Sequence, residues 1–390
     1  MVGLAGCSAG TGASPIARDG GVDDAHAGGG DGSVSQEACT PATQCSGDGS
    51  VQTCGAEGQW ASVWPCATHI CGGGACAGST TEGASCKVSA PGTTDCGASG
   101  ESCCASLEVP GGMYYRTYTN DGSGATAEAD PAWVSGFRFD KYLVTVGRFR
   151  QFVAASVAGW VPAVGSGKHT HLNGGLGLAN SGGPGFEPGW DTSDEPWLPK
   201  TDAEWKAHLN CEPTFQSWTD AAGSNETLPM SCISWYEAYA FCIWDGGFLP
   251  SEAEWEYAAA GGSDQREYPW GSVDGGIGAL YANAGCDFPA GATTCTGVVN
   301  LAPVGTATSG AGRWGQLDLS GGLAEWNVDF LAPYFTPCTD CVFLTDYSYR
   351  LIRGGSFGTD TQNDSPASVT VGDVPEDRGA FTGARCARTP

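Results

Sequence analysis

Three stretches of the chain repeat apolar side chains at the spacing of an α-helix. They follow three residues of the kinds that commonly cap helix N-termini, namely Thr145, Ser234 and Ser251. In the second and third stretches a glutamate stands three residues after the serine, which is the pattern of a capping box, and a pair of glycines ends each stretch. We therefore predict three helices. Their inward-facing side chains are Phe149, Phe152 and Val153 in the first, Trp235, Tyr239, Cys242 and Ile243 in the second, and Trp255, Ala258 and Ala259 in the third.

The third helix begins in the stretch LPSEAEWEY, residues 249 to 257, which holds three glutamates and a tryptophan. Such a composition would also suit an acid/base site. Glu254 completes the capping box, however, and Glu252 stands in the first turn, where a carboxylate suits the positive end of the helix dipole. We interpret the glutamates as serving the helix backbone and the tryptophan as part of the core.

The remainder of the chain shows little periodicity. Between Pro269 and Pro390, only strand fragments such as RLIRGG, at 350 to 355, can be placed among glycine-rich segments. The 62 glycines in 390 residues exceed the usual share, so many turns and loops are expected. This part of the pattern predicts an α+β domain with much irregular structure.

The chain is strongly acidic, with 17 basic against 43 acidic side chains and a net charge of −26. This charge repels nucleic acid and an anionic membrane surface alike, and it excludes nucleic acid as a partner. No apolar run approaches the roughly 20 residues of a membrane-spanning helix. A box resembling that of bacterial lipoprotein signals ends at Cys7, without the charged and apolar regions that normally precede it. We interpret it as a truncated signal, and a lipid on Cys7 as the only attachment to a membrane.

Composition divides the chain into three segments. Residues 1–36 are rich in Gly, Ser, Asp and Ala, and we expect a flexible tether behind the truncated signal. Residues 37–108 carry glycine-rich spacers between cysteines and few large apolar side chains, so they need disulfides to fold and form either a binding module or a spacer. Residues 109–390 have the composition of a core-forming domain.

Nineteen cysteines are too many for a reducing cytosol, and their spacing does not match a zinc site. We expect disulfides in an exported protein, either secreted or held at the cell envelope as a lipoprotein. Apart from Cys7, ten cysteines lie between Cys39 and Cys104 and eight between Cys211 and Cys386. Each region can close its own bridges, and the pairing within 39–104 stays open.

Several blocks of sequence carry a resemblance to a known family. The stretch LPSEAEWEYAAAGG, preceded by MSCISWYEAYAFCIWDGG and followed by YPWG, resembles the signature of the formylglycine-generating enzymes, also called sulfatase-modifying factors. Further blocks agree in order, namely FRFDKYLVTVGRFRQFV, PVG at 303–305, GQLDLSGGLAEW at 315–326, RLIRGGSF at 350–357 and GARC at 383–386. The resemblance implies an irregular α+β fold similar to C-type lectins.

The resemblance also implies a disulfide between Cys242 and Cys386. A second bridge that often reaches the end of the third helix in this family is not expected, because Ala259 stands there. Local pairs are expected among the other six cysteines: short spacing favours Cys286 with Cys295 and Cys338 with Cys341, which leaves Cys211 with Cys232, and the connectivity stays open.

Formylglycine-generating enzymes oxidise a cysteine of a sulfatase with molecular oxygen and a copper(I) ion, which two cysteines beyond RGGS hold. The matching positions here fall near Thr359 and Asp364, and a hydroxyl and a carboxylate do not replace soft thiolates. We therefore expect neither copper nor formylglycine formation. Ser356, Thr359 and Asp364 stay as the candidate residues of a groove.

Two calcium sites are implied by the same resemblance. The first would use Asp318, Gly321, Leu323 and Glu325, with hard oxygen ligands and glycines that allow tight turns. The alternative is that Glu325 caps or forms a salt bridge without a metal. The second site would use Asn283 and Ala284, but no acidic residue stands at the matching later position near Thr296.

An oxygen-dependent non-haem iron enzyme is the alternative within this superfamily, whose sulfoxide synthases bind iron through three histidines. His169 and His171 form the only compact histidine pair here, and a third ligand such as His208 or Asp191 would be required. The other interpretation of the pair is a solvated glycine-rich loop.

Three substitutions inside the family blocks indicate a changed or lost substrate. They are Phe248 for an arginine, Gly322 for an asparagine and Ala324 for a tryptophan, and the last two would widen or flatten the groove. Our leading hypothesis is an exported, calcium-stabilised binding or accessory domain for an unknown protein, peptide or small-molecule ligand. The competing hypothesis is the iron enzyme, acting on an unknown peptide or small molecule.

Overall fold

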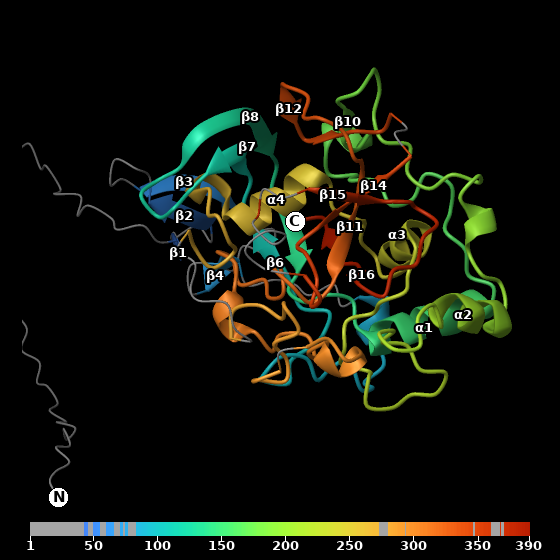
Figure 1. Ribbon diagram of the computed structural model, residues 1–390. Helices are drawn as coiled ribbons and strands as arrows, with labels where there is room; N and C mark the ends of the chain where they lie inside the picture. The colour runs from blue at the N-terminus through green and yellow to red at the C-terminus, as the bar shows by residue number, and fades with distance from the viewer. Residues whose placement is uncertain are drawn as a thin grey trace, which may run out of the picture.

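The protein is described by a computed structural model (Figure 1). It covers residues 83–272, 280–292, 294–345, 348–359, 367 and 370–390, together with the backbone of five short strands before residue 83. Cys7 and Asp364 lie outside the described residues. The early strands form a three-stranded antiparallel sheet, β1-β2-β3, and a two-stranded pair, β4-β5. Their bounds are β1 Thr43–Cys45, β2 Ser50–Cys54, β3 Trp60–Pro65, β4 Cys71–Gly72 and β5 Ala75–Cys76.

The three predicted helices are present and begin at the predicted caps. They are α1 (Val146–Val157), α3 (Trp235–Trp244) and α4 (Glu252–Ala260), and both expected capping boxes are formed. A further helix, α2 (Asp202–Leu209), also begins with a capping box, which joins Thr201 and Glu204. The same T-x-x-E pattern could have identified α2 in the sequence. Short 3-10 helices span Ala84–Cys86, Asn173–Gly175, Glu195–Trp197, Gly262–Asp264, Val298–Asn300 and Thr308–Gly310.

The strands of the main body are short and form four small sheets. The sheet orders are β15-β14-β11-β16, β12-β8-β7, β17-β9-β6 and β10-β13. The bounds are β6 Ser106–Val109, β7 Gly112–Thr119, β8 Thr126–Val134, β9 Phe137–Asp140, β10 Ala179–Asn180, β11 Ala324–Phe330, β12 Cys338–Thr339, β13 Cys341–Val342, β14 Arg350–Arg353, β15 Val371–Asp373, β16 Thr382–Gly383 and β17 Ala387–Arg388. This mixture of short helices, short strands and long loops is the irregular α+β fold that the sequence predicts.

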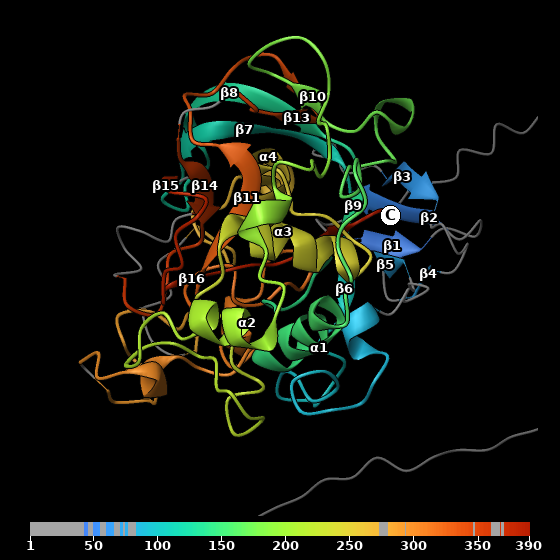
Figure 2. The same ribbon diagram turned by 90° about the vertical axis from the view of Figure 1, so that its right-hand side faces the viewer.

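Helix α4 lies at the centre of the body, and every one of its residues is buried. It contacts β11, which lies beside both α3 and α4 in Figure 2. One part of the core packs α1 and α3 together with α2, through rings such as Phe149, Phe241 and Trp205. The other part packs α4 against β6 to β9. Because a buried helix is normally apolar, the three glutamates of α4 must each find a partner inside the protein.

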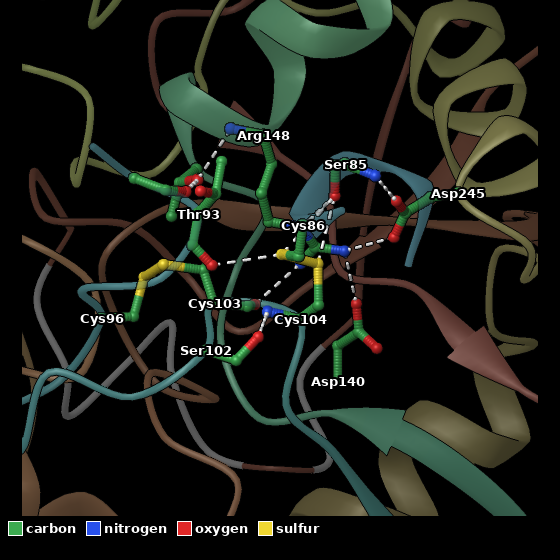
Figure 3. Close-up of a disulfide and its surroundings, with 12 residues drawn as sticks. Ser85, Cys86, Thr93, Cys96, Ser102, Cys103, Cys104, Asp140, Arg148 and Asp245 are labelled. Atoms are coloured by element: carbon green, nitrogen blue, oxygen red, sulfur yellow. Dashed lines mark hydrogen bonds and ion pairs between the residues drawn. A yellow bond between two sulfur atoms is a disulfide. The ribbon is translucent and has the colours of Figure 1, made fainter. Parts of the chain in front are cut away.

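Residues 83–108 belong to this body, although their composition placed them in the Cys-rich segment. Disulfides join Cys86 to Cys104 and Cys96 to Cys103, and all four cysteines are buried in the core (Figure 3). The packing of this segment against α1 was not visible in its composition, because the segment carries few large apolar side chains. The folded body thus extends upstream of residue 109.

The guanidinium of Arg148 on α1 holds the segment 83–108 in place (Figure 3). Its Nε donates to Ser85 Oγ at 3.1 Å, and its Nη1 donates to the Cys103 carbonyl at 3.1 Å. Its Nη2 lies 3.0 Å from Asp140 Oδ2 and 2.6 Å from Asp245 Oδ2. Arg388 contacts the same two carboxylates, so two cations and two anions share one buried cluster.

The remaining disulfides are those that the sequence favours. Cys242 of α3 is joined to Cys386 just before β17, across 144 residues. The local bridges are Cys211–Cys232, Cys286–Cys295 and Cys338–Cys341. Within the described part of the chain, no helix is both long and apolar enough to cross a membrane.

Replacing Arg148 by methionine should lower the free energy of unfolding by about 3–5 kcal/mol, because it leaves a buried carboxylate pair with one cation fewer. Chemical denaturation of the oxidised protein measures the change. The matched control is Lys206→Met, since Lys206 forms an exposed ion pair with Asp202 on α2 and such pairs contribute little. Equal changes for the two variants would contradict the role given to the cluster.

Candidate functional site

A cavity of about 260 Å³ lies where β11, β14, β15 and β16 meet the turn after β14. We call it the RGGS groove, after residues 353–356 on its floor. Ala324, Ile352, Val371 and Phe381 contribute apolar side chains to it. The remaining lining residues are Arg353, Gly354, Gly355, Ser356, Thr359 and Thr382. Two of the three candidate groove residues, Ser356 and Thr359, therefore line one cavity.

The RGGS turn depends on two glycines with positive φ. Gly354 has φ +92° and Gly355 has φ +66°. A Cβ on Gly354 would lie 2.9 Å from the Leu319 carbonyl oxygen and 3.1 Å from the Trp255 ring, so any other residue would be strained there. The Thr359 hydroxyl closes the next turn, because it accepts from the Ser356 amide at 2.8 Å and donates to the Ser356 carbonyl at 2.9 Å.

Beneath the groove, Arg353 is buried against two glutamates of α4. Its Nη2 donates to Glu252 Oε1 and, at 2.9 Å, to Glu256 Oε2. The Tyr334 hydroxyl lies 3.0 Å from Glu252 Oε1 and 3.3 Å from Glu256 Oε2. The positive charge of Arg353 is thus neutralised from below, and it does not make the groove an anion site.

The two glutamates hold different charges. Burial opposes ionisation of Glu252, but Arg353 and Arg116 outweigh it and hold the pKa of Glu252 below its usual value. Burial raises the pKa of Glu256 well above its usual value, and the neighbouring charge of Glu252 adds to the rise despite Arg353. Glu256 Oε1 is buried without a hydrogen-bond partner in the described structure. We therefore assign the charge to Glu252 and a proton to Glu256.

This network extends the interpretation of the sequence. Glu252 is not only a carboxylate at the start of a helix; it is the main counter-charge of Arg353. Glu254 caps α4 as predicted, with Oε2 accepting from the Ser251 amide at 2.8 Å. The spacing of Glu252 and Glu256, four residues apart on one face of the helix, was the available signal that this face carries a buried polar cluster.

The histidine pair predicted as iron ligands has a different arrangement. His169 is buried between two carboxylates, with Nδ1 2.9 Å from Glu187 Oε1 and Nε2 3.0 Å from Glu254 Oε2. Burial lowers the pKa of His169, but these carboxylates outweigh it and raise the pKa to about 10. His169 is therefore an imidazolium, and a ring with protons on both nitrogens does not bind a metal.

The other proposed iron ligands do not join His169. The imidazole of His171 stacks on Phe248, and neither of its nitrogens has a hydrogen-bond partner in the described structure. His208 pairs with Glu237 at 2.8 Å, and Asp191 accepts hydrogen bonds from Ser193 in its own turn. Among the described residues, no three His, Cys, Asp or Glu side chains group so as to hold a metal ion. The predicted iron site is therefore not formed by these residues.

The body also matches a known protein family. Residues 94–390 match the family model described as sulfatase-modifying factor enzyme 1-like domain. The chain belongs to the sulfatase-modifying factor family. The resemblance read from the sequence blocks is thereby confirmed over most of the chain.

Known members that resemble the chain differ in their activities. A formylglycine-generating enzyme of Thermomonospora curvata is 29% identical over 306 residues, which cover 73% of this chain and 93% of that protein. An inactive C-alpha-formylglycine-generating enzyme 2 of Mus musculus is 33% identical over 166 residues, 41% of this chain and 49% of that protein. A hercynine oxygenase of Mycobacterium tuberculosis is 33% identical over 167 residues, 41% of this chain and 36% of that protein. Membership of the sulfatase-modifying factor family therefore does not by itself specify the reaction.

The calcium site implied by the family resemblance does not fit the residues around Glu325. Arg385 Nε lies 3.1 Å from each oxygen of Glu325, and Nη2 lies 2.8 Å from Oε1. Trp255 Nε1 donates to Oε2 at 2.8 Å. A calcium ion on this carboxylate would face the charge of Arg385. Glu325 thus forms a salt bridge, the alternative considered in the sequence analysis, and this contact does not favour the predicted calcium set of Asp318, Gly321, Leu323 and Glu325.

The other calcium ligands have structural roles as well. Asp318 Oδ2 accepts from the Gly305 amide at 2.7 Å, and burial raises the pKa of Asp318 to about 6. Asn283 Oδ1 accepts from the Ala302 amide at 2.8 Å. Ala284, next to it, is fully buried in the core. These residues hold loops together in the sulfatase-modifying factor fold.

The copper chemistry of formylglycine-generating enzymes requires two thiolates in this region. All twelve cysteines from Cys86 to Cys386 are in disulfides. Thr359, at one expected ligand position, contributes a hydroxyl that already closes a turn. Copper(I) prefers soft thiolate ligands, so the described side chains of the groove do not fit this ion.

Isosteric substitutions test the charges assigned to α4. Glu252→Gln should lower the free energy of unfolding by about 3–5 kcal/mol, because it removes the counter-charge of buried Arg353. Glu256→Gln should have a much smaller effect, because the amide resembles the protonated carboxyl. Denaturant unfolding at neutral pH compares the two variants. A larger loss for Glu256→Gln would reverse the assignment.

The His169 cluster predicts a loss of stability at alkaline pH. The folded protein keeps a proton that an unfolded imidazole, with a pKa of about 6.5, releases. The stabilisation is therefore complete below about pH 6.5 and is lost as pH rises through about 10. The free energy of unfolding should fall by up to about 1.4 kcal/mol per pH unit across this range. His169→Gln should remove this slope.

The control for this measurement is His208→Gln on α2, which changes a partly exposed histidine outside the cluster. Urea unfolding at several pH values from 6 to 10 gives the slope for each protein. An unchanged slope in His169→Gln would show that other groups cause it.

Proposed function

We propose that this chain is an exported ligand-binding member of the sulfatase-modifying factor family that does not form formylglycine. The observation that carries the proposal is the set of disulfides, which occupies every cysteine from Cys86 to Cys386. A disulfide sulfur offers no thiolate to copper(I). The oxidising centre of the family therefore has no ligands among the described residues of this body.

The chemistry of the groove lining supports binding rather than catalysis. Among the described residues that line it there is no Cys, His, Lys, Asp or Glu, so the hydroxyl groups of Ser356, Thr359 and Thr382 have no general base in this lining to activate them. The guanidinium of Arg353 is paired with the charge of Glu252 and hydrogen-bonded to Glu256, and the Thr359 hydroxyl is held in a turn. A groove of apolar walls, hydroxyl groups and peptide backbone can select a ligand by its shape.

Export is supported by the disulfides of the body. Such bonds persist in oxidising compartments and are rare in the cytosol. The six bridges between Cys86 and Cys386 include one that spans 144 residues and joins α3 to the C-terminal strand, so the fold depends on oxidation. The iron-enzyme alternative has no comparable support, because His169 is paired on both ring nitrogens.

The oxidised full-length protein should convert no cysteine to formylglycine in a sulfatase peptide, in air and with copper(I) supplied. Mass spectrometry of the peptide detects the product. The formylglycine-generating enzyme of Thermomonospora curvata, assayed in parallel, is the positive control. Turnover by this chain, or stoichiometric copper or iron in the purified protein together with oxidation of the peptide, would overturn the proposal.

A further inference from the structure

The walls of the RGGS groove are apolar and partly open to solvent. Ala324 of β11 and Ile352 of β14 line its inner part, and Val371 and Phe381 stand at its mouth. Val371 is 47% exposed and Phe381 is 37% exposed, although both are large apolar side chains. A ligand that covered them would remove apolar surface from water, which is the main source of affinity in such grooves.

The mouth of the groove is preformed. The Phe381 ring packs 4.9 Å from Phe357 and 5.4 Å from Phe215, measured between ring centroids. A Cβ on Gly358 would lie 2.8 Å from the Phe381 ring, so the glycine leaves room for this packing. Because the ring is held by its neighbours, a ligand does not have to order it on binding.

The size of the groove limits the ligand. Pockets for drug-sized molecules and cofactors have volumes of about 300–1,000 Å³. The RGGS groove, at about 260 Å³, is smaller and suits a single bulky side chain. Ala324 contributes to this space, because it lines the cavity with a side chain of a single carbon. The small residue leaves room that an indole would occupy.

The sheet beside the groove favours an extended chain as the ligand. β15 stands at one end of the order β15-β14-β11-β16, and no strand pairs with its outer edge in the part of the chain that the structure describes. Val371 of β15 lines the groove and is opposite Ile352 of β14. A peptide that added along β15 would point every second side chain to the groove face of the sheet.

Charge selects among such peptides. Asp373 is two residues after Val371 on β15, so the two side chains lie on the same face of the strand. Asp377 follows in the next loop, and the whole chain carries a net charge of −26. The other lining residues in the described part of the chain are uncharged, and Arg353 is paired with Glu252 of α4. A basic residue beside the apolar side chain is therefore favoured over an acidic one.

We propose that the RGGS groove binds an extended peptide segment through one large apolar side chain flanked by basic residues, and that Ala324 sets this specificity. The inference rests on the proposed binding function and names the ligand class of the same groove. Ala324 would be a specificity residue, since a tryptophan at this lining position would fill the space that the anchor side chain needs.

Fluorescence polarisation with labelled eight-residue peptides tests the proposal on the oxidised full-length protein. The peptides carry Trp, Phe, Leu or Ala at one central position between lysines, and a matching set has glutamates in place of the lysines. Peptides with Trp or Phe and lysines should bind best. Replacing the central aromatic by Ala should weaken binding at least about tenfold, the scale of an interface anchor residue.

Ala324→Trp should weaken binding of the aromatic peptides by a similar factor. Ala207→Trp makes the same change at an exposed position of α2, which does not line the groove, and should leave binding unchanged. If Ala324→Trp fails to fold, Val371→Lys tests the same groove from its exposed rim. This variant should weaken lysine-flanked peptides more than glutamate-flanked ones.

The outcomes separate the inference from the proposed function. The inference would be overturned if peptide affinity did not depend on the central residue and were unchanged in Ala324→Trp or Val371→Lys. A binding function would then remain in place. Absence of binding by every peptide would overturn the inference as well. Formylglycine formation, measured in the separate assay, would instead overturn the proposed function.

Discussion

The buried ion pair between Arg353 and Glu252 is the constraint on which the groove depends. An unpaired charge inside a protein is very costly, so the arginine that starts the RGGS turn must lie against the glutamates of α4. This contact fixes β14 over α4 and places Gly354 against the Trp255 ring. The floor of the groove is thus set by a helix that never reaches its surface.

Other buried charges join the same helix to distant segments. Glu254 pairs with His169, and Trp255 shares Glu325 with Arg385 from the C-terminal region. In a separate cluster, Arg148 and Arg388 share Asp140 and Asp245. A fold with short strands and long loops has few repeating contacts to define its topology. We attribute the single folded arrangement of this chain to these buried ion pairs and to the disulfides.

Sequence reasoning succeeded where the interaction is local. The caps of α1, α3 and α4 lie within three residues of the groups that they bind, so Thr145 before an apolar period was sufficient for α1, and S-x-x-E patterns were sufficient for α3 and α4. Helix α2 was missed although it has such a cap, since only Trp205 and Leu209 are buried there and its apolar period is weak. The RGGS groove was located through the family blocks rather than through any periodicity.

The buried ion pairs around the RGGS groove could not be predicted from the sequence, because each pair joins residues that are far apart in the chain. Glu252 and Arg353 are 101 positions apart, and Glu325 and Arg385 are 60 positions apart. The calcium prediction gave Glu325 to a metal because the sequence does not show that Arg385 lies against it. The iron prediction failed in the same way, since the carboxylates that bracket His169 come from two separate segments.

The most direct test of this account is a count of free thiols in the oxidised full-length protein. Alkylation under denaturing, non-reducing conditions, followed by peptide mapping, labels any cysteine that is not in a disulfide. The account predicts no label on any cysteine from Cys86 to Cys386 and linked peptides for the pairs in the structure. A labelled pair of cysteines within this range would contradict it, because two free thiols could restore the copper ligands that this body lacks.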